Sequence, residues 1–347
     1  MVVIDRDAAA NGASIRNFGF VTVTGQRAGD CWSLARRTRD IWVEVAEAAG
    51  IPVVHEGLVV TARRPESEAV IDAFLRTDMG QECRRLTPDE ARKHIESLKT
   101  GAIGGALYSP HELRVESKTA VPGLARWLSE AMDVDFLWST AVQAVCTPKI
   151  ETSRGLIEAE TVIVCPGDDF RSLFSARLAG YGLSRCKLHM LRIKPETSGG
   201  HRAALMSDLG LARYEGYAGL PEAEALQRRL DSEQPHHRQN GIHLIAVASQ
   251  DGSLVVGDSH HYGDTPDPFA DTRIERLILD ELEAVLDLGP YSISETWLGT
   301  YASAPDRWRL TDSPDDATRI ELVTSGCGAS TCFGIAEETI RDLFGGE

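Results

Sequence analysis

The sequence predicts an α/β fold in two parts, one built on a parallel sheet and the other on a mixed or antiparallel sheet. Two short apolar runs, 2–4 and 161–164, stop abruptly at Asp5 and at Cys165-Pro166-Gly167, as buried parallel strands do. The middle of the chain carries longer strand-like segments with a hairpin turn at 250–252, namely 186–194, 242–249 and 253–256.

The first half of the chain alternates helical and strand patterns. A helix is predicted from a cap at Asp30 to a stop at Gly50, followed by a strand over 51–61. Two helices follow within 65–98, the second beginning at the capping box Thr87-Pro88-Asp89-Glu90. Helical spacing returns over 118–132, and short strands are predicted at 134–137 and 141–146.

The second half is expected to contain more loop. Long loops are predicted between Pro195 and Asn240, and an amphipathic helix over 271–288. The chain then ends on strands at 291–300 and 320–324, a glycine-rich turn and a helix over 329–344.

Composition limits the classes of partner and the cellular location. The 36 Lys and Arg against 52 Asp and Glu give a net charge of -16, which repels nucleic acid and anionic membranes. The seven scattered cysteines predict reduced core or site residues, and there is no signal peptide, membrane-spanning run or zinc spacing. We therefore predict a globular cytoplasmic protein without a structural metal.

The start of the chain suggests part of a nucleotide-binding unit. Asp5, at the carboxyl end of the first strand, stands where such units hold ribose hydroxyls. Small and polar residues follow at Gly12-Ala13-Ser14, Asn17 and Gly19, where a pyrophosphate or ring could approach the backbone. The usual preceding strand, G-x-G-x-x-G turn and helix, a unit of roughly 30 residues, are not in the sequence. We expect Met1 to be a late start, with about one β-α element upstream.

The segment 324–331 joins the last strand to the last helix through small residues. Its backbone amides and the positive helix end suit an anion or a developing negative charge. A tight turn that needs glycine for backbone reasons alone is the structural alternative.

Taken together, these stretches resemble the FAD-dependent oxidoreductases of the D-amino acid oxidase and glycine oxidase superfamily. The match lies in Asp5, 12–19, 164–167 and 325–330. Within that superfamily the chain is most similar to a branch associated with phosphonate breakdown, through 107–115, 186–192 and 257–264. The resemblance implies a Rossmann-like FAD-binding domain, lacking its first β-α element, over 1–60, 115–180 and 302–347. A substrate-binding domain would comprise 61–114 and 181–301.

The resemblance also implies roles for individual residues. Asp5 would bind the adenosine ribose, Arg6 would lie beside the adenine, and Val142 would offer its backbone there. The other implied FAD-binding residues are Gly12, Ser14, Arg16, Asn17, Gly167, Gly326, Gly328, Ala329 and Ser330.

The implied substrate is a small anionic amine, such as 2-aminoethylphosphonate or its N-methyl form. Arg114, Lys187 and Arg192 are candidates for the phosphonate, although each could instead pair with an acid such as Glu112 or Glu116. The candidate catalytic residues are His260, His261, Tyr262 and Tyr108. Trp297 and Tyr301 are expected to cover the flavin ring, and Tyr301 is also a candidate substrate-binding residue.

The expected reaction moves a hydride from the amine-bearing carbon to flavin N5, and water hydrolyses the resulting imine. Dioxygen or another acceptor would reoxidise the flavin. Two alternatives stay open: a general amino acid, sarcosine or glycine oxidase, and a cofactor-free remnant without activity. Activity on glycine or sarcosine would favour the first, and a colourless native protein the second.

Overall fold

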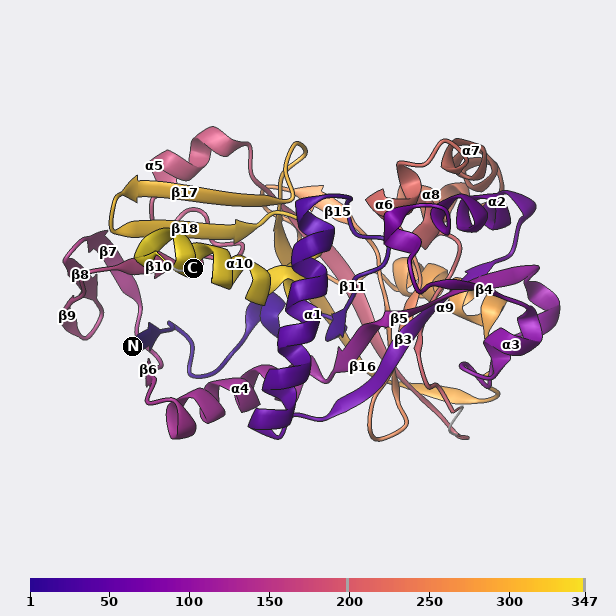
Figure 1. Cartoon of the computed structure of the whole chain (residues 1–347), viewed down its shortest axis with the longest axis horizontal. Helices are drawn as coiled ribbons and strands as arrows, with labels where there is room; N and C mark the ends of the chain where they lie inside the picture. Colours follow the sequence, from indigo (N-terminus) through magenta and orange to yellow (C-terminus); the bar gives the residue numbers. More distant parts are fainter. Residues whose placement is uncertain (198–199, 346–347) are drawn as a thin grey trace.

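A computed structural model describes residues 1–197 and 200–345 (Figure 1). One side of the molecule carries both chain termini and the small sheets around β1, β7 and β10. The other side carries the far end of a large sheet with helices α2, α3, α7 and α9 around it. The long helix α1 (Asp30–Ala49) runs through the middle of this view.

The large sheet is mixed, as predicted for the middle of the chain. Ten strands take part, in the order β15-β11-β14-β13-β12-β3-β5-β2, with β16 on β11 and β4 on β5. Only the β12–β3 pair is parallel among the described pairs of this sheet. The strands are β2 (Phe20–Val21), β3 (Val53–Ala62), β4 (Arg84–Leu86), β5 (Gly105–Val115), β11 (Ser184–Pro195), β12 (Ala204–Met206), β13 (Ile245–Ala248), β14 (Leu254–Gly257), β15 (His261–Gly263) and β16 (Tyr291–Ser303).

The predicted parallel strands belong to separate small sheets. β1 (Val2–Ile4) pairs in parallel with β6 (Asp135–Leu137), and β10 (Val162–Val164) pairs in parallel with β18 (Thr318–Val323). Their side chains correct our prediction of burial, because Val2 is 47% and Ile163 is 40% exposed. The remaining strands are β17 (Arg309–Asp315), antiparallel to β18, and β7 (Val142–Cys146), β8 (Lys149–Thr152) and β9 (Gly155–Glu158).

The terminal helix α10 (Gly328–Phe344) packs against α1, with Gly334 so close to Leu34 that an added Cβ would lie 2.9 Å from its side chain. α1 ends at Gly50, in the left-handed conformation, as predicted. Its N-cap residue is Gly29 rather than Asp30. The other α-helices are α2 (Pro65–Phe74), α3 (Pro88–Arg92), α4 (Ser117–Ala131), α5 (Ser175–Leu178), α6 (Glu215–Ala218), α7 (Ala223–Glu233), α8 (Pro235–Gln239) and α9 (Thr272–Val285).

Two further expectations need correction. The stretch predicted as long loops between Pro195 and Asn240 contains β12, α6, α7 and α8, whose apolar residues complete the core. All seven cysteines are free, but only Cys31, Cys186 and Cys327 are buried. The division into domains stays a prediction, and its expected limit between 60 and 61 falls within β3 of the large sheet. Among the described residues, no helix has the length and apolar character needed to cross a bilayer.

Gly19 provides a test of this packing. Its φ is +61°, and an added Cβ would lie 1.9 Å from the Val115 carbonyl oxygen. Gly12 has the same backbone conformation, with φ +62°, but open space around it. We expect Gly12→Ala to lower the free energy of unfolding by about 1 kcal/mol, from backbone strain alone. Gly19→Ala should lower it by about 3 kcal/mol, because the clash adds to the strain. Urea denaturation compares the two, and equal losses would contradict the close approach to β5.

Candidate functional site

The residues expected at the ribose and adenine gather at the end of β1. One oxygen of the Asp5 carboxylate accepts the Asp7 amide at 2.8 Å, and the other has no partner among the described residues. Arg6 Nη1 lies 2.5 Å from Asp169 Oδ2, which joins this end to the turn after β10 that contains Gly167. The Thr140 amide donates to the Asp5 carbonyl at 2.9 Å, so the start of β7, with Val142, follows close by in the chain.

The loop over 12–19 connects this end to the large sheet. Trp297 Nε1 donates to the Arg16 carbonyl at 3.1 Å, and Gly299 on the same strand leaves room for that carbonyl. The Asn17 amide donates to the carbonyls of Ala13 and Ser14, at 2.7 and 3.1 Å. Asn17 therefore stabilises the loop itself, and Trp297 anchors it to β16.

The loop before α10 lies next to β16. An added Cβ on Gly326 would meet the Tyr301 hydroxyl at 3.6 Å, and one on Gly328 would meet no atom within 4 Å. Buried Cys327 fixes the loop, with its sulfur 2.9 Å from Ser325 Oγ and its carbonyl 3.0 Å from Thr331 Oγ1. Ser330 Oγ accepts the Thr22 amide at 2.8 Å. The amides at the start of α10, including those of Gly328 and Ala329, thus lie in a fixed loop beside Tyr301.

Tyr301, which lies next to Gly326 of this loop, is grouped with Tyr262 and Arg213. Cys186 on β11 is paired with Tyr262 of β15 on one side and Tyr301 of β16 on the other. Arg213 Nη2 donates to the Tyr262 hydroxyl at 3.0 Å and has no acid within ion-pair distance among the described residues. Burial opposes its charge, but Tyr262, Tyr301 and Asp258 outweigh burial and raise the pKa of Arg213. Burial raises the pKa of Tyr301 well above its usual value, so its phenol stays neutral and can donate.

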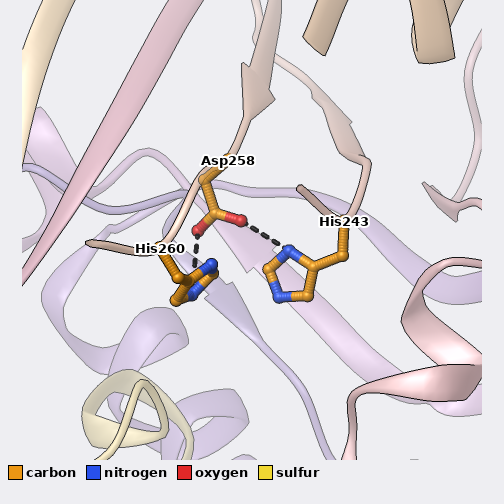
Figure 2. A group of neighbouring side chains, drawn as sticks. All are labelled: His243, Asp258 and His260. Atoms are coloured by element: carbon orange, nitrogen blue, oxygen red, sulfur yellow. Dashed lines mark ion pairs between the residues drawn. The ribbon is translucent and has the colours of Figure 1, made fainter. Parts of the chain in front are cut away.

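A buried carboxylate, Asp258, lies between His243 and His260 (Figure 2). Asp258 Oδ1 is 2.6 Å from His243 Nδ1, and Asp258 Oδ2 is 3.9 Å from His260 Nε2. The rings of His243 and His260 meet edge to face, and Tyr214 stacks on His243. Burial, with Arg213 second, lowers the pKa of His260 well below its usual value.

One possible metal-ligating atom from each of His243, Asp258 and His260 lies within 4.8 Å of the others, a spacing that metal ligands also have. The 2.6 Å distance between Asp258 Oδ1 and His243 Nδ1 argues against a metal bound by these two atoms. Two ligands about 2.0–2.2 Å from one tetrahedral ion would lie about 3.3 Å apart.

Carboxylates already engage the three cations predicted for the substrate. Arg114, fully buried, and Arg192 both pair with Glu116, at 3.2 and 3.3 Å. Lys187 pairs with Asp267 at 2.8 Å. On the sheet, Lys187 of β11 lies opposite His261 of β15. Glu116 was one of the two acids that we had named as structural partners.

The predicted catalytic residues divide between two places. His260, Tyr262 and Tyr301 lie together, with ring centres of both tyrosines 6.5 Å from His260. His261 instead binds Asn240, at 3.0 Å, and faces His189. Tyr108 stacks on His94 and on the Arg84 guanidinium, elsewhere in the sheet.

Sequence reasoning missed four residues of the site. Arg213 and Tyr214 fall in the stretch that we interpreted as loop. His243 and Asp258 exchange backbone hydrogen bonds at 3.1 and 3.3 Å, one step beyond the β13–β14 hairpin. If the register of the predicted hairpin is continued past the end of its strands, Asp258 falls opposite the residue next to His243.

Comparisons with known proteins now bear on the cofactor. The family model for FAD dependent oxidoreductases, DAO, matches residues 1–341. The chain belongs to this family. None of the curated proteins matches the chain.

Solved structures share the fold of this DAO-family protein. Glycine oxidase from Geobacillus kaustophilus superposes with a TM-score of 0.77 at 16% identity, over 100% of this chain and 88% of that one. L-proline dehydrogenase from P. horikoshii superposes with a TM-score of 0.74 at 16% identity, over 99% of this chain and 86% of that one. Iminodiacetate oxidase from Chelativorans sp. BNC1 superposes with a TM-score of 0.73 at 16% identity, over 100% of this chain and 89% of that one.

The residues present fit FAD, the cofactor of this DAO-family protein. An acid with an unpartnered oxygen, Asp5, suits the ribose hydroxyls, and the backbone at Gly12, Gly167 and Gly328 has room for close approach. The start of α10 supplies amides for negative charge on the reduced ring.

His189 provides a pH test of the sheet that carries the site. It is 2% exposed, and its Nε2 accepts the Asp271 amide at 3.1 Å. Burial and Lys187 lower its pKa to about 4, so the folded state resists protonation. Because the unfolded pKa is about 6.5, unfolding takes up a proton between these values, and stability falls on acidification from 6.5 towards 4. Between pH 7 and pH 5 this costs about 2 kcal/mol.

We expect His189→Gln to remove about 2 kcal/mol of the pH dependence, as urea denaturation at pH 7 and pH 5 would show. An unchanged difference between the two pH values would mean that His189 does not titrate in this way.

Proposed function

We propose that this FAD-dependent oxidoreductase oxidises a small amine that carries an anionic group, with aminophosphonates such as 2-aminoethylphosphonate or its N-methyl form as the substrate class. Arg213 is the observation that supports this most directly. It is a partly buried cation, close to Tyr262 and Tyr301, to which no described carboxylate is paired. A partly buried charge is stabilised by an anionic partner, and the substrate would supply one.

The groups around Arg213 suit an anion with three oxygens. The guanidinium offers a planar fork of donors, and the hydroxyls of Tyr262 and Tyr301 add two more. Tyr262 is 56% exposed, so this end of the site is open to solvent. Arg114, Lys187 and Arg192 are not part of the proposal, because carboxylates already neutralise them.

When bound, FAD would supply the acceptor for the hydride that leaves the amine-bearing carbon, and dioxygen or another acceptor would reoxidise it. The protein's contribution is to position the substrate. Arg213 and the two phenols would hold the anionic end and so restrict where the amine-bearing carbon lies. Water would hydrolyse the imine product to an aldehyde and ammonia or methylamine.

An oxidase of glycine, sarcosine or another amino acid is the second candidate. The names of the similar structures, glycine oxidase and iminodiacetate oxidase among them, favour it. A carboxylate has two oxygens and would need only the Arg213 fork.

Anaerobic mixing of the FAD-loaded protein with each substrate separates the candidates. We expect 2-aminoethylphosphonate or its N-methyl form to bleach the flavin absorbance faster than glycine, sarcosine or D-alanine at equal concentration. Bleaching by the amino acids alone would replace the phosphonate assignment with the second candidate. Bleaching by none of them would contradict both.

Arg213→Met tests the anion-binding role. The variant keeps an unbranched, flexible side chain but removes the guanidinium and its charge, and we expect kcat/KM for the anionic amine to fall about 100-fold. Arg202→Met, at a side chain that is 75% exposed, is the matched control and should leave kcat/KM unchanged. Steady-state kinetics with both variants, after their flavin content is checked, make the comparison. Equal activity of the two variants would remove Arg213 from the site.

A further inference from the structure

One oxygen of the buried Asp258 carboxylate is left without a hydrogen-bond donor. The residue is 4% exposed, and its Oδ1 forms an ion pair with His243 Nδ1 at 2.6 Å. No N–H or O–H among the described residues donates to Oδ2, which has His260 Nε2 as its neighbour at 3.9 Å. Burial of an ionised carboxylate is costly unless a cation or donor completes its shell. Oδ2 therefore requires a further donor.

His260 points a second acceptor into the same space. Its Nδ1 lies 3.0 Å from the Gly241 carbonyl, which can only accept, so Nδ1 carries the ring proton. Nε2 then presents its lone pair towards Asp258 Oδ2, 3.9 Å away. Burial and Arg213 lower the pKa of His260, which keeps the ring neutral near pH 7. Two acceptors facing each other at this distance repel unless a donor lies between them.

The chemistry of that donor follows from the spacing. An ammonium nitrogen about 2.8 Å from each acceptor bridges a gap of this size. The cluster also adjoins the anion end of the site, because His260 contacts Tyr262 and Tyr301 and the charge of Asp258 acts on Arg213. A carboxylate and a guanidinium at neighbouring positions match a molecule with an ammonium group at one end and an anion at the other.

We propose that Asp258 and His260 bind the ammonium group of the substrate and that Asp258 takes a proton from it. This proposal rests on the function proposed above. One N–H bond of the ammonium breaks, its electron pair stays on nitrogen, and the proton forms an O–H bond with Asp258 Oδ2. The amine then has the lone pair that it needs when the neighbouring C–H bond is cleaved. His243 positions the carboxylate through Oδ1.

The test compares two ligands that differ only at the amine, 2-aminoethylphosphonate and propylphosphonate. Calorimetric titration of the anaerobic, dithionite-reduced FAD protein measures binding without turnover. We expect the wild-type protein to prefer the amine at least 10-fold. Asp258→Asn should lose about 100-fold in affinity for the amine and little for propylphosphonate. Asp264→Asn, at an exposed acid after β15, is the control and should retain the preference.

Several outcomes would overturn the proposal. Equal affinity of the wild-type protein for the two ligands would overturn it, even if the Asp258→Asn variant fails to fold. An equal loss of affinity for both ligands in Asp258→Asn would also overturn it, because it would indicate a structural role. Amine binding that EDTA abolishes and Zn²⁺ restores would make the cluster a metal site instead. If neither phosphonate binds, the phosphonate assignment fails. The affinities for glycine and propionate, which also differ only at the amine, then test the role of Asp258. A preference for glycine that Asp258→Asn abolishes would then still support the role of Asp258.

Discussion

The pairing of β11 with three other strands determines where the polar groups of the site lie. β16 follows β11 along its whole length, from Ser184 opposite Ser303 to Pro195 opposite Tyr291. On the other edge β15 pairs at one end and β14 further along. Tyr301 and Tyr262 therefore flank the same residue, Cys186, and Asp258 follows directly after β14. The same β16 carries Trp297 to the 12–19 loop, so cofactor residues and substrate residues share one strand.

The distribution of buried charge separates structural ion pairs from groups that need a ligand. Glu116 joins Arg114 and Arg192, and Glu295 pairs with Arg192 as well, so two carboxylates balance the two guanidiniums within the fold. Arg213 has only a phenol as partner, and Asp258 has a partner at Oδ1 but no donor at Oδ2 among the described residues. Because the charge of Asp258 acts on Arg213, the protein leaves one cation and one anion incomplete in the same region. That pattern is typical of a site for a zwitterionic molecule.

Local signals in the sequence were sufficient for most elements, and the family resemblance was sufficient for FAD as the cofactor. The capping box at Thr87 and the left-handed Gly50 mark helix ends through their own backbone chemistry. The substrate side depends on contacts distant in sequence. Whether an arginine binds an acid or stays available is decided by tertiary pairing, which is why Arg192 and Arg213 could not be distinguished. The burial of β1 was overestimated because an apolar run records side-chain type and not the layers around it.

A crystal structure of the reduced, FAD-loaded protein with 2-aminoethylphosphonate tests the account most directly. We predict the phosphonate oxygens within hydrogen-bond distance of Arg213 and the phenols of Tyr262 and Tyr301. The ligand nitrogen should lie between Asp258 and His260, and the carbon that bears it should face the flavin ring. A ligand bound at Arg114 and Arg192 instead, or one that leaves Asp258 without a donor, would contradict the assignment of this site.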